Sequence, residues 1–302
     1  MNGIEILSET ARLLGCEVRR DEPMSRHTTF RIGGPAELFL TAPDLPALKG
    51  ICQKAAETGI PILPLGNGSN LLVSDAGIHG AVVTLGSVFR KISLVSETSI
   101  LCGTAASIAS LCDFAKSQSL TGAEFAWGIP GSMGGAVFMN AGAYGHCVSE
   151  IISFCSHITK DGKEGTLSGS GLDFGYRHSA YSSGGFIITA VRVELKHGVQ
   201  AEIAAQMDEI YTRRKAKQPL DLPSAGSVFK RPKGHYAGML IEQCGLKGRR
   251  VGGAAVSEKH AGFIVNLGGA TCADVEKLIA VIQETVLRET GVTLECEVRK
   301  AG

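Results

Sequence analysis

A glycine-rich stretch from Gly128 to Gly145 is the segment best suited to bind a ligand through its backbone. It holds six glycines in 18 residues, and a residue without a Cβ lets main-chain N–H groups approach an anion closely. A second loop, Gly66-Asn67-Gly68-Ser69-Asn70, lies between a β-type run, Ile60 to Leu65, and the apolar Leu71-Leu72-Val73. Two such loops predict one long ligand that contains a pyrophosphate, although each loop alone is equally compatible with tight turns.

Several common catalytic signals are absent from the chain. The Gly66 loop lacks the third glycine of the dinucleotide fingerprint, and no Gly-x-x-x-x-Gly-Lys-Ser/Thr, His-Glu-x-x-His or Gly-x-Ser-x-Gly sequence occurs. The nine cysteines include no Cys-x-x-Cys pair. This favours reduced and mostly buried thiols, and it predicts no metal site.

The charge balance predicts a small-molecule partner. The chain has 302 residues, with 30 Lys plus Arg against 29 Asp plus Glu, so there is no cationic surplus to hold a nucleic acid or an anionic membrane. No apolar run approaches the ~20 residues of a membrane span, and the first residues lack the pattern of a signal peptide. We therefore expect a cytoplasmic protein of two domains, present as a monomer.

The pattern of elements predicts an α+β fold. Asp44 can cap a helix from Leu45 to Thr58 that Gly59 ends, and a second helix is predicted near residues 105–117. Five further β-type runs are Ala81 to Leu85, Ile92 to Val95, Ser99 to Cys102, Ile151 to Ile158 and Phe186 to Leu195. Their spacing favours a mixed domain over a regular doubly wound sheet.

The remaining third of the chain predicts a second domain. An amphipathic helix is expected over Val199 to Gln218, and we place the domain boundary just before it. Thr271 and Asp274 form the pattern of a capping box that opens a helix ending at Gly291. Apolar and polar residues alternate from Val292 to Val298. This pattern predicts a strand in which Glu295 and Glu297 share one face and Cys296 points to the other.

Seven blocks in this order resemble the UDP-N-acetylenolpyruvoylglucosamine reductase family. They are Thr28-Thr29-Phe30-Arg31-Ile32-Gly33-Gly34, the Gly66 and Gly128 loops, Tyr176-Arg177-His178-Ser179, Ala225-Gly226-Ser227-Val228-Phe229-Lys230, Val256-Ser257-Glu258-Lys259-His260-Ala261 and Glu297-Val298-Arg299. The resemblance extends over nearly the whole chain. The short spacing from Arg177 to Ser227 is similar to the family type that lacks an inserted tyrosine-bearing loop.

The resemblance implies a fold and a reaction. The implied fold begins with an FAD-binding domain of the vanillyl-alcohol-oxidase (PCMH) type over residues 1–198, which consists of two α+β lobes with a boundary near residue 86. A smaller α+β substrate-binding domain follows over residues 199–302. The implied reaction starts when NADPH reduces the flavin. The flavin then passes hydride to the enolpyruvyl group of UDP-N-acetylglucosamine enolpyruvate, which gives UDP-N-acetylmuramate for peptidoglycan synthesis, cell shape and cell division.

Three residues are implied to be catalytic. Arg177 supplies a permanent, forked donor for the carboxylate of an acid-enolate. Ser227 matches the family's proton donor to the carbanionic carbon, and Glu297 matches the glutamate that assists the developing acid-enolate, which requires burial to raise its pKa. Without the resemblance, these residues would be read as a surface ion pair, a turn residue and a solvated carboxylate.

The resemblance also implies which residues bind the ligands. For FAD these are Arg31, Gly66, Asn67, Gly68, Ser69, Asn70, Leu71, Gly128, Ile129, Pro130, Gly131, Ser132, Gly134, Gly135, Ala136, Asn140, Ala141, Gly142 and Tyr176. For the substrate and its diphosphate they are Lys230, Arg231, His260 and Arg299. Arg231 departs from the family pattern, in which Asn is common at that position, and the extra charge either tightens diphosphate binding or points into solvent.

Two alternatives stay open from the sequence. The first is another flavoprotein of the same fold that oxidises an alcohol or a sugar. The second is a catalytically inert nucleotide-binding homologue that kept the two loops. The joint presence of Arg177, Ser227 and Glu297 argues against the second alternative, and oxygen consumption with an alcohol or sugar would favour the first.

Overall fold

Local signals in the sequence determine where several elements begin and end. In the computed structural model, which describes residues 2–302, α2 (Leu45–Thr58) starts at Asp44, whose carboxylate accepts a hydrogen bond from Ala47 N–H at 2.9 Å. It ends at Gly59 in the left-handed conformation, as predicted. The capping box of α7 (Cys272–Thr290) is also confirmed, with Thr271 as N-cap and Gly291 at the C-terminus.

The chain divides into two compact units that are each built from three stretches. Unit 1 contains the residues up to Arg20, Leu38–Asn67 and Gly80–Arg213, whereas unit 2 contains Asp21–Glu37, Gly68–His79 and Arg214–Gly302. The division falls within α5 (Gln200–Lys217). Two short early segments thus join the C-terminal part of the chain, while the domain extents 1–198 and 199–302 stay a prediction.

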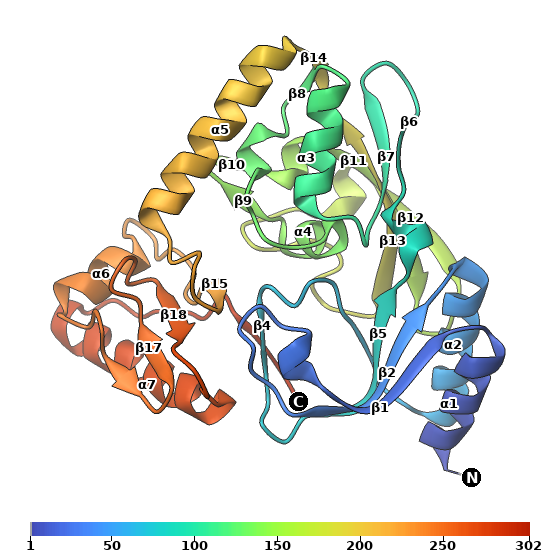
Figure 1. The fold of residues 1–302 in the computed structure, drawn as a ribbon, viewed down its shortest axis with the longest axis horizontal. Coiled ribbons are helices and arrows are strands. Elements are labelled where there is room, and N and C mark those ends of the chain that lie inside the picture. The colour runs from blue at the N-terminus through green and yellow to red at the C-terminus, as the bar shows by residue number, and fades with distance from the viewer. Residues whose placement is uncertain (1) are drawn as a thin grey trace. The chain divides into compact units, whose positions relative to one another are not determined.

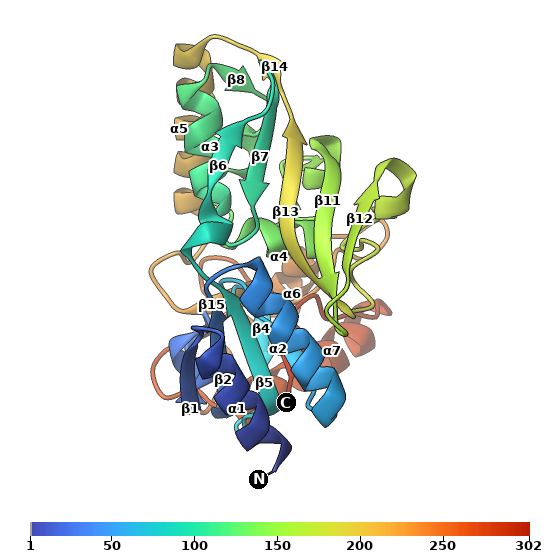
Figure 2. The same ribbon diagram turned by 90° about the vertical axis from the view of Figure 1, so that its right-hand side faces the viewer.

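Most of a four-stranded sheet belongs to unit 1, with two helices beside it, while a few end residues of β1 (Glu17–Pro23), β2 (Pro35–Ala42) and β5 (Ile78–Leu85) belong to unit 2. The strand order is β1, β2, β5 and β3 (Ile62–Pro64), and β3 runs parallel to β5. The helices α1 (Gly3–Leu13) and α2 lie next to this sheet (Figure 2). Leu7, Leu48 and Ile51 of the helices pack in one core with Leu38 and Leu40 of β2.

The second layer of unit 1 is a five-stranded antiparallel sheet. Its order is β12 (Glu164–Ser168), β11 (Ile152–Thr159), β13 (Phe186–Glu194), β7 (Ser99–Gly103) and β6 (Ile92–Leu94). The helices α3 (Ile108–Ser117) and α4 (Met133–Met139) bury Leu111 and Val137 against Ile100, Cys155 and Val191 of the sheet. Two small pairs complete the unit: β9 (Gly142–Ala143) with β10 (His146–Cys147), and β8 (Leu120–Thr121) with β14 (Lys196–His197).

Unit 2 is a sheet covered by α6 (Ala237–Gln243) and α7 (Figure 1). Its strands follow the order β15 (Ser224–Ser227), β18 (Phe263–Asn266), β17 (Ala254–Val256) and β16 (Arg250–Val251). Phe30 and Leu72 from the early segments are buried in the same core as Val275 and Ile282 of α7. The mixed content of helices and strands in both units confirms the predicted α+β class.

The predicted strand Val292 to Val298 is wrong. Within residues 2–302 this segment makes only one isolated bridge, Phe229 to Cys296, and the true strand is β19 (Arg299–Ala301), which pairs in parallel with β4 (Leu71–Val73). The physical reason is that β4 aligns with Arg299–Ala301 and not with the residues before them, where the carbonyl of Glu297 accepts from the Asn70 side chain at 3.1 Å. Consequently Glu295 is exposed and Glu297 is half-buried, and Cys296, which we expected on an opposite face, is exposed as well.

Candidate functional site

The start of the Gly66 loop, Gly66 and Asn67, meets the Gly128 loop within unit 1. A Cβ on Gly66 would overlap Ser132 Oγ, so the Gly66 loop lies against the Gly128 loop at a distance that only glycine permits. The Gly128 loop is held in place by the helix that follows it, because Ser132 caps α4 (Met133–Met139) and its Oγ accepts from Gly135 N–H at 3.3 Å. The structure therefore brings together the two loops that the sequence predicted to share one ligand.

Free main-chain donors are concentrated where these loops meet. Among residues 2–302, no hydrogen bond is formed by the N–H groups of Gly66, Asn67, Gly131 and Ser132. By contrast, Gly134 N–H donates to Thr104 O at 3.0 Å and Met133 N–H to Ala106 O at 2.9 Å. Unpaired N–H groups on adjoining loops are able to donate to the oxygens of a phosphate. An anion such as a pyrophosphate would thus be held through these four N–H groups rather than through that of Gly134.

Arg177 occupies a strained turn that is joined to the end of the Gly128 segment. Gly175 and His178 exchange backbone hydrogen bonds of 3.0 and 3.2 Å, which leaves Tyr176 and Arg177 at the tip. Arg177 has a φ of 54°, unusual for a residue with a Cβ, and its guanidinium lies 5.2 Å from the centre of the Tyr176 ring. Asn140 Nδ2 donates to Gly175 O at 2.8 Å, so Asn140, Tyr176 and Arg177 belong to one structural feature.

Ser227 lies beside His260 in unit 2. It ends β15, where the pairing with β18 is irregular between Ser224 and Ser227, and its Oγ donates to Phe229 O at 3.2 Å. A Cβ on Gly262 would lie 3.5 Å from Ser227 Oγ and 3.1 Å from His260 Nδ1. Burial lowers the pKa of His260, and Gly262 N–H donates to His260 Nδ1 at 3.1 Å. The ring is therefore neutral at pH 7 with its proton on Nε2.

Glu297 is adjacent to the residue that follows Ser227. Its N–H donates to Val228 O at 2.7 Å, and Lys230 N–H donates to Glu295 O at 2.8 Å. The Lys230 ammonium pairs with the Glu295 carboxylate at 3.1 Å, which offsets its charge. The guanidinium of Arg231 lies 4.0 Å from the centre of the exposed Tyr236 ring. Unit 2 therefore places Ser227, Glu297, Lys230 and His260 around two adjoining segments.

Comparison with known proteins identifies the family. The chain is 47% identical over 285 residues to the UDP-N-acetylenolpyruvoylglucosamine reductase of Latilactobacillus sakei, covering 94% of this chain and 93% of that one. The chain belongs to the UDP-N-acetylenolpyruvoylglucosamine reductase family. The enzyme of that name from Agathobacter rectalis is 44% identical over 313 residues, covering 100% and 99% of the two chains.

Family models and solved structures agree with this assignment. Residues 218–301 match the C-terminal domain of UDP-N-acetylenolpyruvoylglucosamine reductase, and residues 36–168 match an FAD binding domain. The crystal structure of the reductase from Thermus caldophilus is similar with a TM-score of 0.82 and 36% identity, covering 95% of this chain and 99% of that one. A chitooligosaccharide oxidase, with a TM-score of 0.50 and 9% identity over 96% and 60% of the chains, shares the fold alone.

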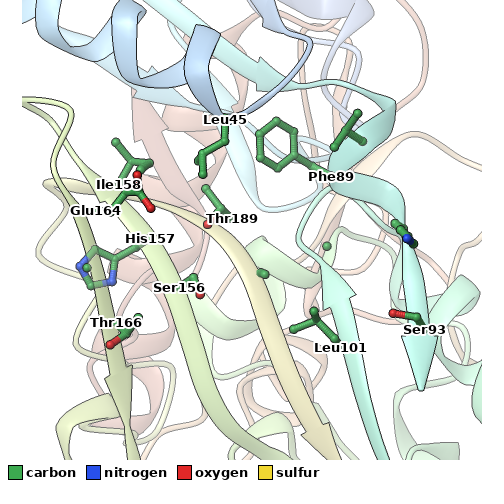
Figure 3. Close-up of a pocket in the computed structure, with 15 residues that line it drawn as sticks. Leu45, Phe89, Ser93, Leu101, Ser156, His157, Ile158, Glu164, Thr166 and Thr189 are labelled. Carbon is green, nitrogen blue, oxygen red and sulfur yellow. The ribbon is translucent and has the colours of Figure 1, made fainter. Parts of the chain in front are cut away.

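A pocket of about 630 Å³ lies elsewhere in unit 1 of this reductase family member, and none of the predicted site residues lines it. Leu45, Phe89, Leu101, Ser156 and Thr189 are among the residues around it (Figure 3). The nearby His157 ring bonds Tyr181 OH through Nδ1 at 3.1 Å, which is a core contact. We assign this pocket no part in the family's reaction.

No group of three or more His, Cys, Asp or Glu side chains could hold a metal ion within residues 2–302. All nine cysteines are free thiols, six of them are buried, and burial raises the pKa of Cys102 and Cys155 to about 12. The helices of that same range include none with the length and apolar character needed to span a bilayer.

Sequence reasoning missed two contributors to the site. The sequence pattern assigns no role to Thr29, and it predicts Asn70 only as a contact of the cofactor. The structure shows that Thr29 Oγ1 donates to Ser224 O at 2.7 Å and Asn70 Nδ2 to Glu297 O at 3.1 Å. The partners are 195 and 227 residues away, so no local pattern could have revealed them.

Proposed function

We infer that this protein is an FAD-dependent reductase that uses NADPH to convert UDP-N-acetylglucosamine enolpyruvate to UDP-N-acetylmuramate for peptidoglycan synthesis. Identity along nearly the whole chain to proteins of this name supports the reaction. The observation that carries the assignment of residues is the 2.7 Å hydrogen bond from Glu297 N–H to Val228 O, because it fixes Glu297 beside the Ser227 segment.

The free amides of Gly66, Asn67, Gly131 and Ser132 would hold the pyrophosphate of FAD. When bound, FAD supplies hydride to the terminal carbon of the enolpyruvyl group. Negative charge then develops on the adjacent carbon and its carboxylate, and the site needs a cation and a proton source at that point. The residues of this chain can meet both needs.

Arg177 is proposed to bind the substrate carboxylate through its forked guanidinium, which stabilises the acid-enolate. Ser227 Oγ donates its proton to the carbon next to the carboxylate, so that one hydride and one proton complete the reduction, and it then regains a proton from solvent. Glu297 shares a proton with the developing anion rather than opposing it with a full charge. His260, being neutral, offers an Nε2–H donor and adds no charge.

Cationic residues of unit 2 are proposed to bind the substrate. Arg231 and Arg299 are exposed, and together with Lys230 they are proposed to contact the diphosphate of the substrate. We propose further that residues 1–198 form the FAD-binding domain and 199–302 the substrate-binding domain. The enzyme is proposed to act as a cytoplasmic monomer, and light scattering of the purified protein tests the oligomeric state.

Rapid mixing experiments test the assignment. The purified protein should be yellow, should lose flavin absorbance anaerobically with NADPH, and should regain it when the enolpyruvyl substrate is added. Ser227→Ala should keep the first step within about twofold and slow the second by about 10²- to 10⁴-fold, the usual contribution of a general acid. Failure of NADPH to reduce the flavin would reject the proposed donor, and equal loss of both steps would reject the role of Ser227.

A further inference from the structure

The loop Gly68–Asn70 is hydrogen-bonded directly to the segment of Glu297 and, through Thr29, to the segment of Ser227. Thr29 N–H donates to Gly68 O at 3.2 Å, while Thr29 Oγ1 donates to Ser224 O, at the start of the strand that ends in Ser227. Asn70 Nδ2 donates to Glu297 O, and Asn70 O accepts from Arg299 N–H at 3.1 Å. All of these residues lie in unit 2, so the bonds form one continuous connection within that unit.

Neither segment is held in place by regular strand pairing. The register of β15 against β18 shifts between Ser224 and Ser227, and Gly226 has a φ of 76°. The segment before β19 forms the isolated bridge from Cys296 to Phe229, in which Lys230 N–H donates to Glu295 O at 2.8 Å and Glu297 N–H to Val228 O at 2.7 Å. A regular ladder would have fixed these backbones through several hydrogen bonds. In addition to its irregular backbone pairing, each segment receives one bond from a side chain that belongs to an early part of the chain.

We propose that Thr29 and Asn70 are positioning residues for the proton-donating site. Thr29 fixes the position of the strand that carries Ser227, and Asn70 fixes the position of the segment that carries Glu297. Because Thr29 is also bonded to the Gly68–Asn70 loop, the strand and the segment keep a constant separation. This inference rests on the proposed roles of Ser227 and Glu297. Its physical basis is that catalytic groups misplaced by about 1 Å can lose about 10²-fold in rate.

The experiment uses the FAD-loaded enzyme and four variants. Thr29→Val removes the hydroxyl donor and keeps the size of the side chain, Thr29→Ser restores the donor, and Asn70→Ala removes the amide. Gln283→Ala is the matched control, because Gln283 Nε2 donates to Leu294 O at 2.8 Å, three residues before Glu297. It deletes the same kind of bond on the same segment without touching the Gly68–Asn70 loop.

Asn70→Ala should slow flavin reoxidation by the enolpyruvyl substrate by about 10- to 100-fold. Thr29→Val should show a loss of the same order, and Thr29→Ser should recover most of it. In Thr29→Val, reduction by NADPH and the dissociation constant for FAD should stay within about twofold of the wild type. Hydrogen exchange provides a readout besides activity, since residues 294–302 should exchange faster in Asn70→Ala than in Gln283→Ala.

Several results would overturn the inference. One is reoxidation at the wild-type rate in Asn70→Ala and Thr29→Val. Another is a parallel loss of FAD affinity and of both half-reactions in Asn70→Ala, which would make Asn70 a cofactor ligand only. If flavin reoxidation were slowed equally in Gln283→Ala, the loss of rate in Asn70→Ala would reflect a general destabilisation of the segment. If Asn70→Ala does not fold, the Thr29→Val and Thr29→Ser pair decides the question alone.

Failure of the proposed function would look different. Ser227→Ala and Glu297→Gln are measured in the same series. If these two variants reoxidise as fast as the wild type, the assigned proton chemistry is wrong. If they are slow while Asn70→Ala and Thr29→Val are fast, only the positioning role is rejected.

Discussion

The carboxylate of Asp75 accepts a 2.7 Å hydrogen bond from Cys272 N–H at the start of α7, and its second oxygen accepts from Ala273 N–H at 3.0 Å. Asp75 belongs to the early segment Gly68–His79 of unit 2, so it satisfies two N–H groups that the first turn of a helix leaves unpaired. A negative charge at that end also interacts favourably with the helix dipole. Asp75 therefore joins a distant segment to the longest helix of the unit.

Asp75→Ala should lower the free energy of unfolding by about 1–2 kcal/mol, because it removes both acceptors. Urea denaturation of the FAD-free protein measures this change. Asp113→Ala is the control, since Asp113 forms an exposed pair with Lys116 at 2.8 Å that is expected to contribute no more than about 1 kcal/mol. Equal effects of the two substitutions would show that the Asp75 contact does not stabilise unit 2.

Gly66→Ala should weaken FAD binding by about tenfold or more, which corresponds to about 1.4 kcal/mol. The added Cβ overlaps Ser132 Oγ and should force the two loops apart. In the double variant Gly66→Ala/Ser132→Ala the opposing oxygen is gone, so part of the affinity should return. Fluorescence titration of the apoprotein with FAD measures both effects. Identical affinities for Gly66→Ala and the double variant would mean that contact between the loops is not what restricts residue 66.

Two neighbouring carboxylates should differ sharply in their importance. Glu295 is exposed and paired with Lys230, whereas Glu297 is half-buried beside the Ser227 segment. Glu297→Gln should slow flavin reoxidation by the enolpyruvyl substrate by about 10²-fold or more. Glu295→Gln should leave that rate within about threefold, since an exposed ion pair contributes little. Rapid mixing of the reduced enzyme with substrate gives both rates, and a reversal of the order would reassign the role to Glu295.

Acid should destabilise the protein partly through His260. Burial lowers the pKa of His260 below its ordinary value of 6.5, so the folded state resists protonation while the unfolded state accepts it. The stability due to the neutral ring is fully present above about pH 6.5 and is lost as the pH falls toward the folded-state pKa. His260→Gln should therefore flatten the dependence of unfolding free energy on pH below about 6.5.

His157 is the necessary comparison for this pH experiment. Burial lowers the pKa of His157 as well, so the wild-type slope contains contributions from both rings and His260→Gln should remove only part of it. Denaturation curves at several pH values give the slope for each variant. An unchanged slope in His260→Gln would show that His260 does not contribute to the acid sensitivity.

Features with local causes could be predicted from the sequence. The limits of α2 follow from Asp44 and Gly59, and the start of α7 follows from Thr271 and Asp274, because caps act within one turn. The two glycine-rich loops were also recognisable, since their composition is unusual over a few residues. The strand β3 is shorter than the run Ile60 to Leu65 because only Ile62–Pro64 pairs with β5.

Features that depend on distant partners could not be predicted. Alternation favoured a strand over Val292 to Val298, but strand pairing requires a neighbour, and β4 aligns with Arg299–Ala301 instead. The same limit applies to the bond between Thr29 and Ser224 and to the contact between Asp75 and α7. Residue types narrowed the candidates for the site, whereas the links between them came from tertiary structure.

The three-part composition of unit 2 has a consequence for how the chain acquires its structure. Phe30 and Leu72 are buried among residues such as Val275 and Ile282, which a ribosome makes some two hundred residues later. Until then these early apolar side chains have no permanent neighbours, whereas most of unit 1 is already synthesised. Closing such long loops is entropically costly and slow. The assembly of unit 2 is thus expected to be the late step of folding, and the period of greatest risk from aggregation precedes it.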